Sequence, residues 1–225
     1  MELTIYHGSS NVIPAPEYGK GKVNNDYGLG FYCTESIELA KEWACSKDTD
    51  GFVNKYHIET DGLSILNLSD KEYTILHWLA VLLKNREFDL RSDIASDART
   101  YLIMNYLPDY EDVDIIIGYR ADDSYFSFAS QFLKNTISLE KLSTAMHLGK
   151  LGEQVVLKSK RAFSRLQYVE SITAERTIYY PKMLARDTKA RTDFISLRDS
   201  KENAVEAVYM IDILREGRKN YEAGI

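Results

Sequence analysis

The sequence predicts an α+β fold: a β-rich chain with a helical insertion near its middle and a helical extension at its C-terminus. The clearest strand is residues 52–59, whose side chains alternate between two faces. The clearest helical segment is residues 69–107, which contains no glycine and repeats its apolar residues every three or four positions. The tail from about residue 203 to residue 218 is also expected to be helical.

The N-terminal part begins with two short strands and a helix. Residues 3–8 form a short strand that ends in a long, turn-rich loop, and a second strand covers about residues 30–33. Residues 36–46 have an amphipathic pattern, which predicts a helix with Thr34 or Ser36 as its N-cap. The strand of residues 52–59 follows this helix.

The second half of the chain alternates between short strands and helices. The expected elements are a strand at 114–118, helices at 127–133 and 138–147, a strand at 154–157, a helix at about 162–166 and a strand at about 168–172. We expect one main domain, residues 1–176, with the helical insertion at about residues 69–107, and a C-terminal helical extension, residues 177–225.

Size and composition favour a folded protein in the cytoplasm. With 225 residues, 44% of them hydrophobic, the chain can bury a substantial core. Its apolar runs are shorter than a membrane span, and the N-terminus lacks the pattern of a signal peptide, so we expect no membrane association. Cys33 and Cys45 have no partners at metal-ligand spacing, which predicts free structural thiols and no metal site.

The charge balance argues against a general nucleic-acid-binding protein. The net charge is −6, whereas phosphate binding needs a cationic surface. We interpret the basic clusters as solvated faces balanced by neighbouring acids, and a nucleic-acid surface is the less favoured alternative. These clusters are Lys158, Lys160, Arg161 and Arg165, and later Arg176, Lys182, Arg186, Lys189 and Arg191.

Two short motifs near the N-terminus predict a binding cleft. The first is Tyr6-His7-Gly8-Ser9, and the second runs from Asp26 to Thr34 as Asp-Tyr-Gly-Leu-Gly-Phe-Tyr-Cys-Thr. Each places a polar or aromatic side chain beside glycines in a strand-like apolar run. Glycine lets a flat ligand lie close to the backbone, where a β-carbon would obstruct it.

This pair of motifs resembles the first two motifs of the His-Tyr-Glu class of ADP-ribosyltransferases, the class of diphtheria toxin and the poly-ADP-ribose polymerases. The resemblance implies the fold of that class, with a split, mostly antiparallel β core, and NAD as the substrate. His7 would contact the adenine-side ribose, the Gly8 backbone would hold the nicotinamide carboxamide, and Ser9 would belong to the same NAD-binding set. Taken alone, His7 is also explained as a histidine that caps a loop at the end of a strand.

The resemblance also assigns the aromatic residues. In the Gly-x-Gly-apolar-Tyr motif of the class, Gly30 would lie against NAD and the Tyr32 ring would stack on nicotinamide. Trp43 stands eleven residues later, where polymerase-like relatives place a second aromatic side chain, and would close the other side of the ring. Core packing is an equally good explanation for Trp43, and Tyr32 alone is an ordinary strand residue.

The third motif departs from the pattern of the class, whose members place an acidic residue at the start of a late strand. The aligned position here is Gln154, and Glu153 before it would point to the opposite face. The amide of Gln154 can hydrogen-bond a ribose hydroxyl but carries no charge to stabilise a cationic transition state. We therefore expect transfer of single ADP-ribose units, with His7, Tyr32 and Gln154 as catalytic residues. Glu153 stays the alternative, and a Gln154→Glu variant should keep activity.

Over most of its length the chain resembles a bacterial branch catalogued as domain-of-unknown-function family 3990. The likeness spans roughly residues 3 to 170 and includes the element Ala121-Asp122-Asp123 and the late strand that begins at Gln154. Asp122 and Asp123 are also explained as a turn or a helix N-cap, and a general-base role for Asp123 is an alternative.

The resemblance implies a bacterial mono-ADP-ribosyltransferase that moves ADP-ribose from NAD to a macromolecular acceptor, as the toxin of a toxin–antitoxin pair does. Two alternatives stay open: an inactive relative that serves as a binding module, and an NAD glycohydrolase in which water replaces the acceptor. The sequence leaves open whether the acceptor is protein, RNA, DNA or a small molecule.

The C-terminal tail carries an apolar stripe. Its members are Val205, Val208, Met210, Ile211, Ile213 and Leu214. Packing on its own domain is the favoured interpretation, because a monomer rarely leaves so much apolar surface uncovered. The alternative is an interface for a small antitoxin or a second copy of the chain.

Overall fold

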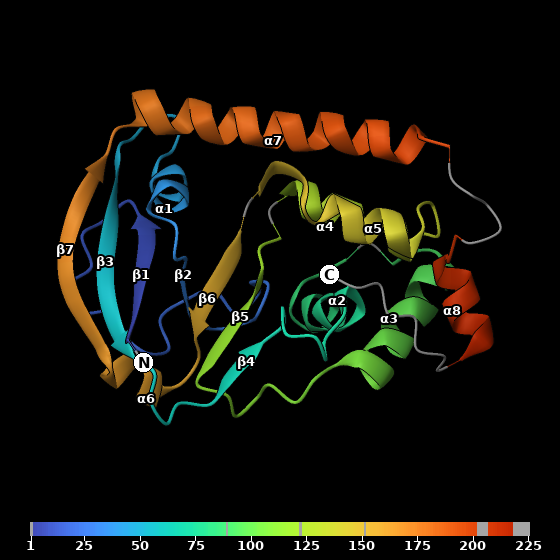
Figure 1. Ribbon diagram of the computed structural model, residues 1–225, viewed down its shortest axis with the longest axis horizontal. Helices are drawn as coiled ribbons and strands as arrows, with labels where there is room; N and C mark the ends of the chain where they lie inside the picture. The colour runs from blue at the N-terminus through green and yellow to red at the C-terminus, as the bar shows by residue number, and fades with distance from the viewer. Residues whose placement is uncertain (1, 89, 122, 151, 202–206, 218–225) are drawn as a thin grey trace.

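The computed structural model of the chain describes residues 2–88, 90–121, 123–150, 152–201 and 207–217 (Figure 1). Its described strands form two sheets. The first has the order β1-β3-β7, with β1 at Glu2–Ser9, β3 at Gly51–Glu59 and β7 at Leu166–Ala174. The second has the order β2-β6-β5-β4, with β2 at Phe31–Cys33, β6 at Glu153–Leu157, β5 at Ile115–Tyr119 and β4 at Ile65–Asn67.

The two sheets meet where β1 runs beside β2. Tyr6 and Thr34 exchange two backbone hydrogen bonds of 2.8 and 3.0 Å, and the strands diverge on either side of this bridge. Strand pairing is antiparallel throughout, except that β4 and β5 are parallel. The expected α+β fold with a split, mostly antiparallel β core is therefore confirmed.

Most of the helices lie beside the second sheet, on the side away from the first sheet, and one long helix crosses the ends of the strands (Figure 1). Ser36 caps the first of them, since its hydroxyl accepts a hydrogen bond of 3.3 Å from the backbone N–H of Leu39. The helices are α1 at Ile37–Ala44, α2 at Ile75–Asn85, α3 at Asp93–Tyr106, α4 at Asp123–Leu133, α5 at Leu139–Ala145, α6 at Lys160–Ser164, α7 at Arg176–Asp199 and α8 at Met210–Glu216.

The helical insertion supplies a large part of the larger hydrophobic core. In α2 nearly every residue from Ile75 to Leu83 is buried, and Trp78 is among the largest buried side chains. A second, smaller core lies between the two sheets around Ile5, Tyr56 and Val155. Both sheets are therefore fixed on their inner faces, which holds the bridge between β1 and β2 in place.

The structure differs from the sequence-based expectation at three elements. Strand β4 was not expected, and α4 begins at Asp123 rather than at residue 127. The extension begins with one 24-residue helix, α7, that packs along α1, α4 and α5 (Figure 1). The expected tail helix is seen only as α8, because residues 202–206 and 218–225 lie outside the described part.

The apolar stripe of the tail packs on the chain itself. Met210 and Ile213 are fully buried in the larger core, and Val208 and Leu214 pack against it. These four residues therefore pack on their own domain, as the favoured interpretation predicted. Val205 lies outside the described residues. A partner would therefore have to contact other residues.

Two further expectations concern cysteines and membranes. Cys33 and Cys45 are both buried free thiols, as expected. Within the described ranges, none of the helices combines the length and the apolar character that crossing a membrane requires.

Candidate functional site

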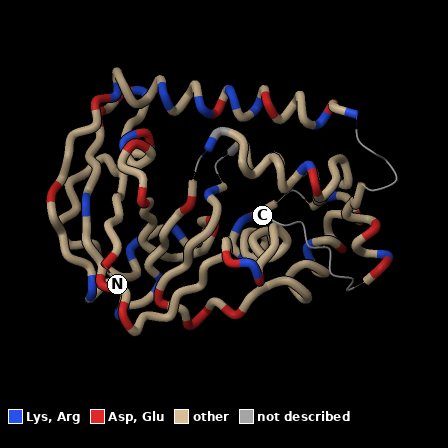
Figure 2. The backbone as a smooth tube through the Cα atoms, in the orientation of Figure 1, with Lys and Arg blue, Asp and Glu red and all other residues tan. Residues whose placement is uncertain are grey.

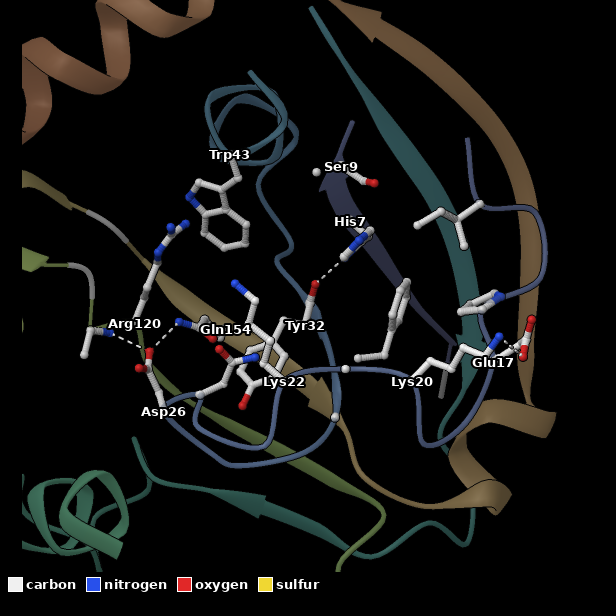
Figure 3. Close-up of a pocket in the computed structure, with 18 of the residues that line it drawn as sticks. His7, Ser9, Glu17, Lys20, Lys22, Asp26, Tyr32, Trp43, Arg120 and Gln154 are labelled. Carbon is white, nitrogen blue, oxygen red and sulfur yellow. Dashed lines mark hydrogen bonds and ion pairs between the residues drawn. The ribbon is translucent and has the colours of Figure 1, made fainter. Parts of the chain in front are cut away.

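A cleft of about 880 Å³ lies where the two sheets diverge, between β1, β2, α1 and the loop that follows β1 (Figure 3). All seven residues that the sequence analysis selected for NAD line this cleft, although they come from four separate segments of the chain. They are His7, Gly8, Ser9, Gly30, Tyr32, Trp43 and Gln154.

His7 lies near the end of β1 with its ring fixed on two sides. Its Nδ1 is 2.7 Å from the carbonyl oxygen of Tyr32, and its ring stacks on Phe31 at a centroid distance of 4.4 Å. A carbonyl only accepts, so Nδ1 carries the proton. Burial lowers the pKa of His7, and the hydrogen bond to Tyr32 only partly opposes this effect. The ring is therefore neutral at pH 7, and Nε2 can accept a hydrogen bond.

Gly8 offers its backbone to the cleft. Alternate residues of a strand direct their N–H and C=O groups to the same side, and Tyr6 uses both groups to bridge Thr34, the residue after β2. The N–H and C=O of Gly8 therefore point the same way, beyond the bridge, where the sheets have separated. One donor and one acceptor side by side match a carboxamide group.

The glycines have a structural reason that the sequence analysis did not foresee. A β-carbon on Gly8 would lie 2.1 Å from the carbonyl oxygen of Ala40, because α1 packs directly on β1. At Gly30 it would lie 2.6 Å from Val156, and Gly28 has a φ of +72°. Glycine is thus required here by close packing and turn geometry, rather than by the approach of a ligand alone.

Tyr32 is held rigidly at the base of the cleft. Its hydroxyl donates to the carbonyl oxygen of Gly28 at 2.6 Å and accepts from the N–H of Tyr27 at 3.1 Å. Burial raises the pKa of Tyr32 far above its ordinary value, so the phenol keeps its proton. Tyr32 can offer a ring face but cannot act as a base near neutral pH.

Trp43 projects from α1 into the same cleft, opposite the β2 side (Figure 3). It is half-buried, and the guanidinium of Arg120 lies over its ring at 4.2 Å from the centroid. Trp43 therefore lines the cleft and is not fully enclosed by the core, whose packing was the alternative considered from the sequence. Arg120 and Trp43 together form one wall of the cleft.

Gln154 is oriented by Asp26. Its amide nitrogen donates to the Asp26 carboxylate at 3.1 Å, so the amide oxygen is the end that can accept a hydrogen bond in the cleft (Figure 3). Asp26 is only 5% exposed and also accepts from the N–H of Ala121 at 2.9 Å and from Arg86 at 3.1 Å. Burial raises the pKa of Asp26, although both of these contacts oppose the rise.

Glu153 is directed elsewhere. Its carboxylate accepts a hydrogen bond from the hydroxyl of Ser69, and it is not among the residues that line the cleft. Its backbone pairs with Tyr119 in a regular antiparallel ladder, without a bulge at this point. Between the two candidates for the third motif, only Gln154 reaches the cleft.

Sequence reasoning missed several residues of the cleft. Asp26 belongs to the second motif, but nothing in the sequence indicated that it would contact Gln154. Arg86 follows α2 and Arg120 follows β5, so only the folded chain brings them to the cleft. Asp123 begins α4, in keeping with a helix start, and Asp122 lies outside the described residues.

The cleft has a positive lining. Four cations and two carboxylates line it, and each carboxylate has a cationic partner: Glu17 with Lys20 at 2.9 Å and Asp26 with Arg86 at 3.1 Å. Because His7 is neutral, the lining carries an excess of two positive charges. Figure 3 shows Lys22 reaching from the loop into the cleft, whereas Lys20 lies beside Glu17. Such a lining suits a ligand with two negative charges.

The fold and the site together define a class: an α+β protein with a split sheet and a cationic cleft that contains a neutral histidine, two aromatic rings and an oriented amide. The chain belongs to the family described as "Protein of unknown function (DUF3990)", whose model matches residues 3–168. A search of curated proteins found no match, and a search of solved structures found none. Strands β2 to β6 lie within the matched range, whereas α7 and α8 lie outside it.

Proposed function

We propose that this protein is a mono-ADP-ribosyltransferase that binds NAD in the cleft and transfers ADP-ribose to a macromolecular acceptor. The observation that carries the proposal is the convergence of His7, Gly8, Tyr32, Trp43 and Gln154 on one cleft, because a resemblance of short motifs does not require it. The volume of the cleft, about 880 Å³, lies in the range of sites for ligands of this kind.

The chemistry of the lining fits NAD part by part. The N–H and C=O of Gly8 suit the nicotinamide carboxamide, and the rings of Tyr32 and Trp43 suit its flat ring. The neutral Nε2 of His7 suits a ribose hydroxyl. The excess of two positive charges suits the pyrophosphate, which carries two negative charges.

The reaction would be a substitution at the ribose carbon that carries nicotinamide. The bond from this carbon to the nicotinamide nitrogen breaks, and nicotinamide leaves as a neutral molecule with the electron pair of that bond. A nucleophile of the acceptor forms the new bond and releases its proton to water. Positive charge develops on the ribose in between, and the amide oxygen of Gln154, whose dipole Asp26 holds, would stabilise it.

The biological setting is part of the proposal and rests on the resemblance. We expect a bacterial toxin that acts in the cytoplasm and is neutralised by a small antitoxin. Because the apolar stripe of the tail is occupied by the chain's own core, the antitoxin or a second copy of the chain would bind another surface.

The test follows both products of NAD. The protein is incubated with NAD labelled in the adenylate part, with and without fractionated bacterial lysate, and released nicotinamide and label in macromolecules are measured. Wild type should release nicotinamide and label a lysate component, whereas Gln154→Ala should lose both. The matched control is Gln167→Ala, an exposed glutamine of β7 outside the cleft, which should behave as wild type.

The two alternatives give other results. Nicotinamide release without label in any macromolecule would indicate an NAD glycohydrolase. NAD binding without release would indicate an inactive binding module. Either outcome would contradict the transferase proposal.

A further inference from the structure

We infer that a second groove, continuous with the NAD cleft, receives the acceptor, and that the acceptor is a single-stranded nucleic acid. The inference rests on the proposed function and adds the class of acceptor to it. The groove has a volume of about 450 Å³ and lies between α7 on one side and α1 with the end of β5 on the other. That size accommodates one unit of a polymer rather than a whole dinucleotide.

The groove opens onto the cleft where the reaction is expected. Trp43, Arg86, Arg120 and Ala121 line both hollows. Trp43 is the residue proposed to cover nicotinamide, so a group in the groove would lie next to the bond that breaks. Transfer needs the nucleophile held at this position, because orientation supplies much of the rate in reactions between two bound groups.

The charge of the groove favours an anionic acceptor. Its lining contains four arginines and two carboxylates: Arg186 pairs with Glu42 and Arg191 with Asp187, whereas Arg86 and Arg120 are shared with the cleft. The cleft and the groove together therefore carry an excess of two positive charges, in a chain whose net charge is −6. Arginine is the side chain best suited to phosphate, since its planar fork can make two parallel hydrogen bonds. The charged residues are Arg86, Arg120, Arg186, Arg191, Glu42 and Asp187.

Flat surfaces in the groove favour nucleic acid over an acidic peptide. The stacked pair of Arg120 and Trp43 presents a planar surface. Leu184, which is 45% exposed, adds an apolar side chain to the lining of the groove. Bases stack on aromatic and guanidinium planes regardless of sequence. A glutamate-rich peptide could pair with the arginines but would leave these planes uncovered.

Helix α7 contributes half of this groove from outside the range that matches the family. Figure 2 shows Lys and Arg along α7 with Asp between them. The solvated-face interpretation holds for Lys182 and Lys189, which pair with Glu38 at 3.3 Å and Asp193 at 2.7 Å. Arg186 and Arg191 are paired as well, with Glu42 and Asp187 at 2.8 Å each, and in addition they line the groove.

The experiment measures binding of labelled single-stranded RNA and single-stranded DNA of mixed sequence by fluorescence anisotropy, in the absence of NAD. The groove variant is Leu184→Ser with Arg191→Ala. The matched control is Ile195→Ser with Arg198→Ala: it lies on the same helix outside the groove, and Ile195 is 50% exposed. Both arginines belong to exposed ion pairs, so neither double variant should unfold.

Wild type and the control should bind at least one of the two strands equally well and with a strong salt dependence, and the groove variant should bind about tenfold more weakly. The inference would be overturned if the groove variant and the control variant bound the strands equally well, or if wild type bound neither strand. It would also be overturned if wild type bound a glutamate-rich peptide more tightly than either strand. A separate NAD titration keeps the two proposals apart, because the groove variant should bind NAD as wild type does.

Discussion

At the scale of single residues, the contact between Asp26 and Gln154 is the most consequential feature of the site. A buried carboxylate next to a glutamine fixes which end of the amide faces the ligand. The sequence analysis expected Gln154→Glu to keep activity, but the structure gives the opposite expectation. A glutamate there would place two carboxylates within hydrogen-bond distance, and one of them would have to bind a proton or move away.

This contact leads to a prediction with an internal rescue. Gln154→Glu and Asp26→Asn should each lower nicotinamide release by about 10- to 100-fold, because an asparagine in place of Asp26 can donate to Gln154 and turn its amide nitrogen toward the cleft. The double variant restores one carboxylate and one amide in exchanged positions and should recover much of the activity. Steady-state rates of the four proteins check this, and a double variant that is weaker than both single variants would contradict it.

The neutral state of His7 predicts how NAD binding depends on pH. Burial lowers the pKa of His7, so the ring stays neutral to lower pH than an ordinary histidine does. NAD affinity should be nearly constant from about pH 8 to 6.5, the pH at which an ordinary histidine is half protonated. It should fall at lower pH as Nε2 gains a proton and can no longer accept. Calorimetry across this range checks the prediction.

The control for the pH prediction is His7→Ala, whose affinity should be lower throughout and should not vary with pH. Asp26, whose pKa is raised by burial, also titrates on the acid side. If the pH dependence persists in His7→Ala, Asp26 rather than His7 causes it.

At the scale of elements, the sequence predicted those segments whose local pattern agrees with their tertiary role. The amphipathic pattern of α1 and the alternation of β3 were sufficient to predict these elements, and Ser36 is one of the two N-cap candidates that the sequence offered. Strand β4 was missed because three residues are too short for a periodic signal and, unlike the equally short β2, it does not follow a glycine motif. The position of α7 follows from its contacts with α1, such as Arg186 with Glu42, which no local pattern reveals.

The residues of the cleft divide in the same way, into those that a local motif reveals and those that only a long-range contact brings to the cleft. Residues in motifs near the N-terminus could be named from the sequence, because strand, glycines and aromatic side chains lie close together in the chain. Arg86, Arg120 and the role of Asp26 could not, since each depends on a long-range contact. The glycines were identified for an incomplete reason: at Gly8 the packing of α1 on β1 excludes a β-carbon.

The packing at Gly8 predicts a large cost for the smallest change. Gly8→Ala would bring its β-carbon to 2.1 Å from a backbone oxygen of α1, which cannot move alone. The free energy of unfolding should fall by about 1–3 kcal/mol, the usual cost of overpacking. Urea denaturation measures it, with Ser9→Ala on the same strand as the control. A Gly8→Ala variant as stable as wild type would show that β1 and α1 are less closely packed.

The ion pair between Arg186 and Glu42 predicts how α7 is fastened. Glu42 is 3% exposed and accepts two hydrogen bonds of 2.8 Å from the guanidinium. Arg186→Ala should lower the free energy of unfolding by roughly 3 kcal/mol, since a buried charge loses its partner. Arg191→Ala, from an exposed pair on the same helix, should cost less than about 1 kcal/mol. Similar losses for both would contradict this account.

At the scale of the whole molecule, the C-terminal region completes the core instead of forming a separate unit. Ile213 is fully buried with Met210 against the helical insertion. Ile213→Ala should therefore lower the free energy of unfolding by about 2–5 kcal/mol, whereas Ile195→Ala, half-exposed on α7, should have little effect. A chain that ends before residue 203 should unfold or precipitate. A soluble, NAD-binding truncated chain would show that the tail is dispensable.

The central claim is that the split between the two sheets is an NAD site. Calorimetric titration of NAD into wild type, His7→Ala, Tyr32→Ala and the control His57→Ala, a histidine outside the cleft, tests it most directly. The account predicts that wild type and His57→Ala bind equally. His7→Ala and Tyr32→Ala should each lose about 1–3 kcal/mol, which is about 5- to 150-fold in affinity. No measurable binding of NAD by the wild-type protein would contradict the account.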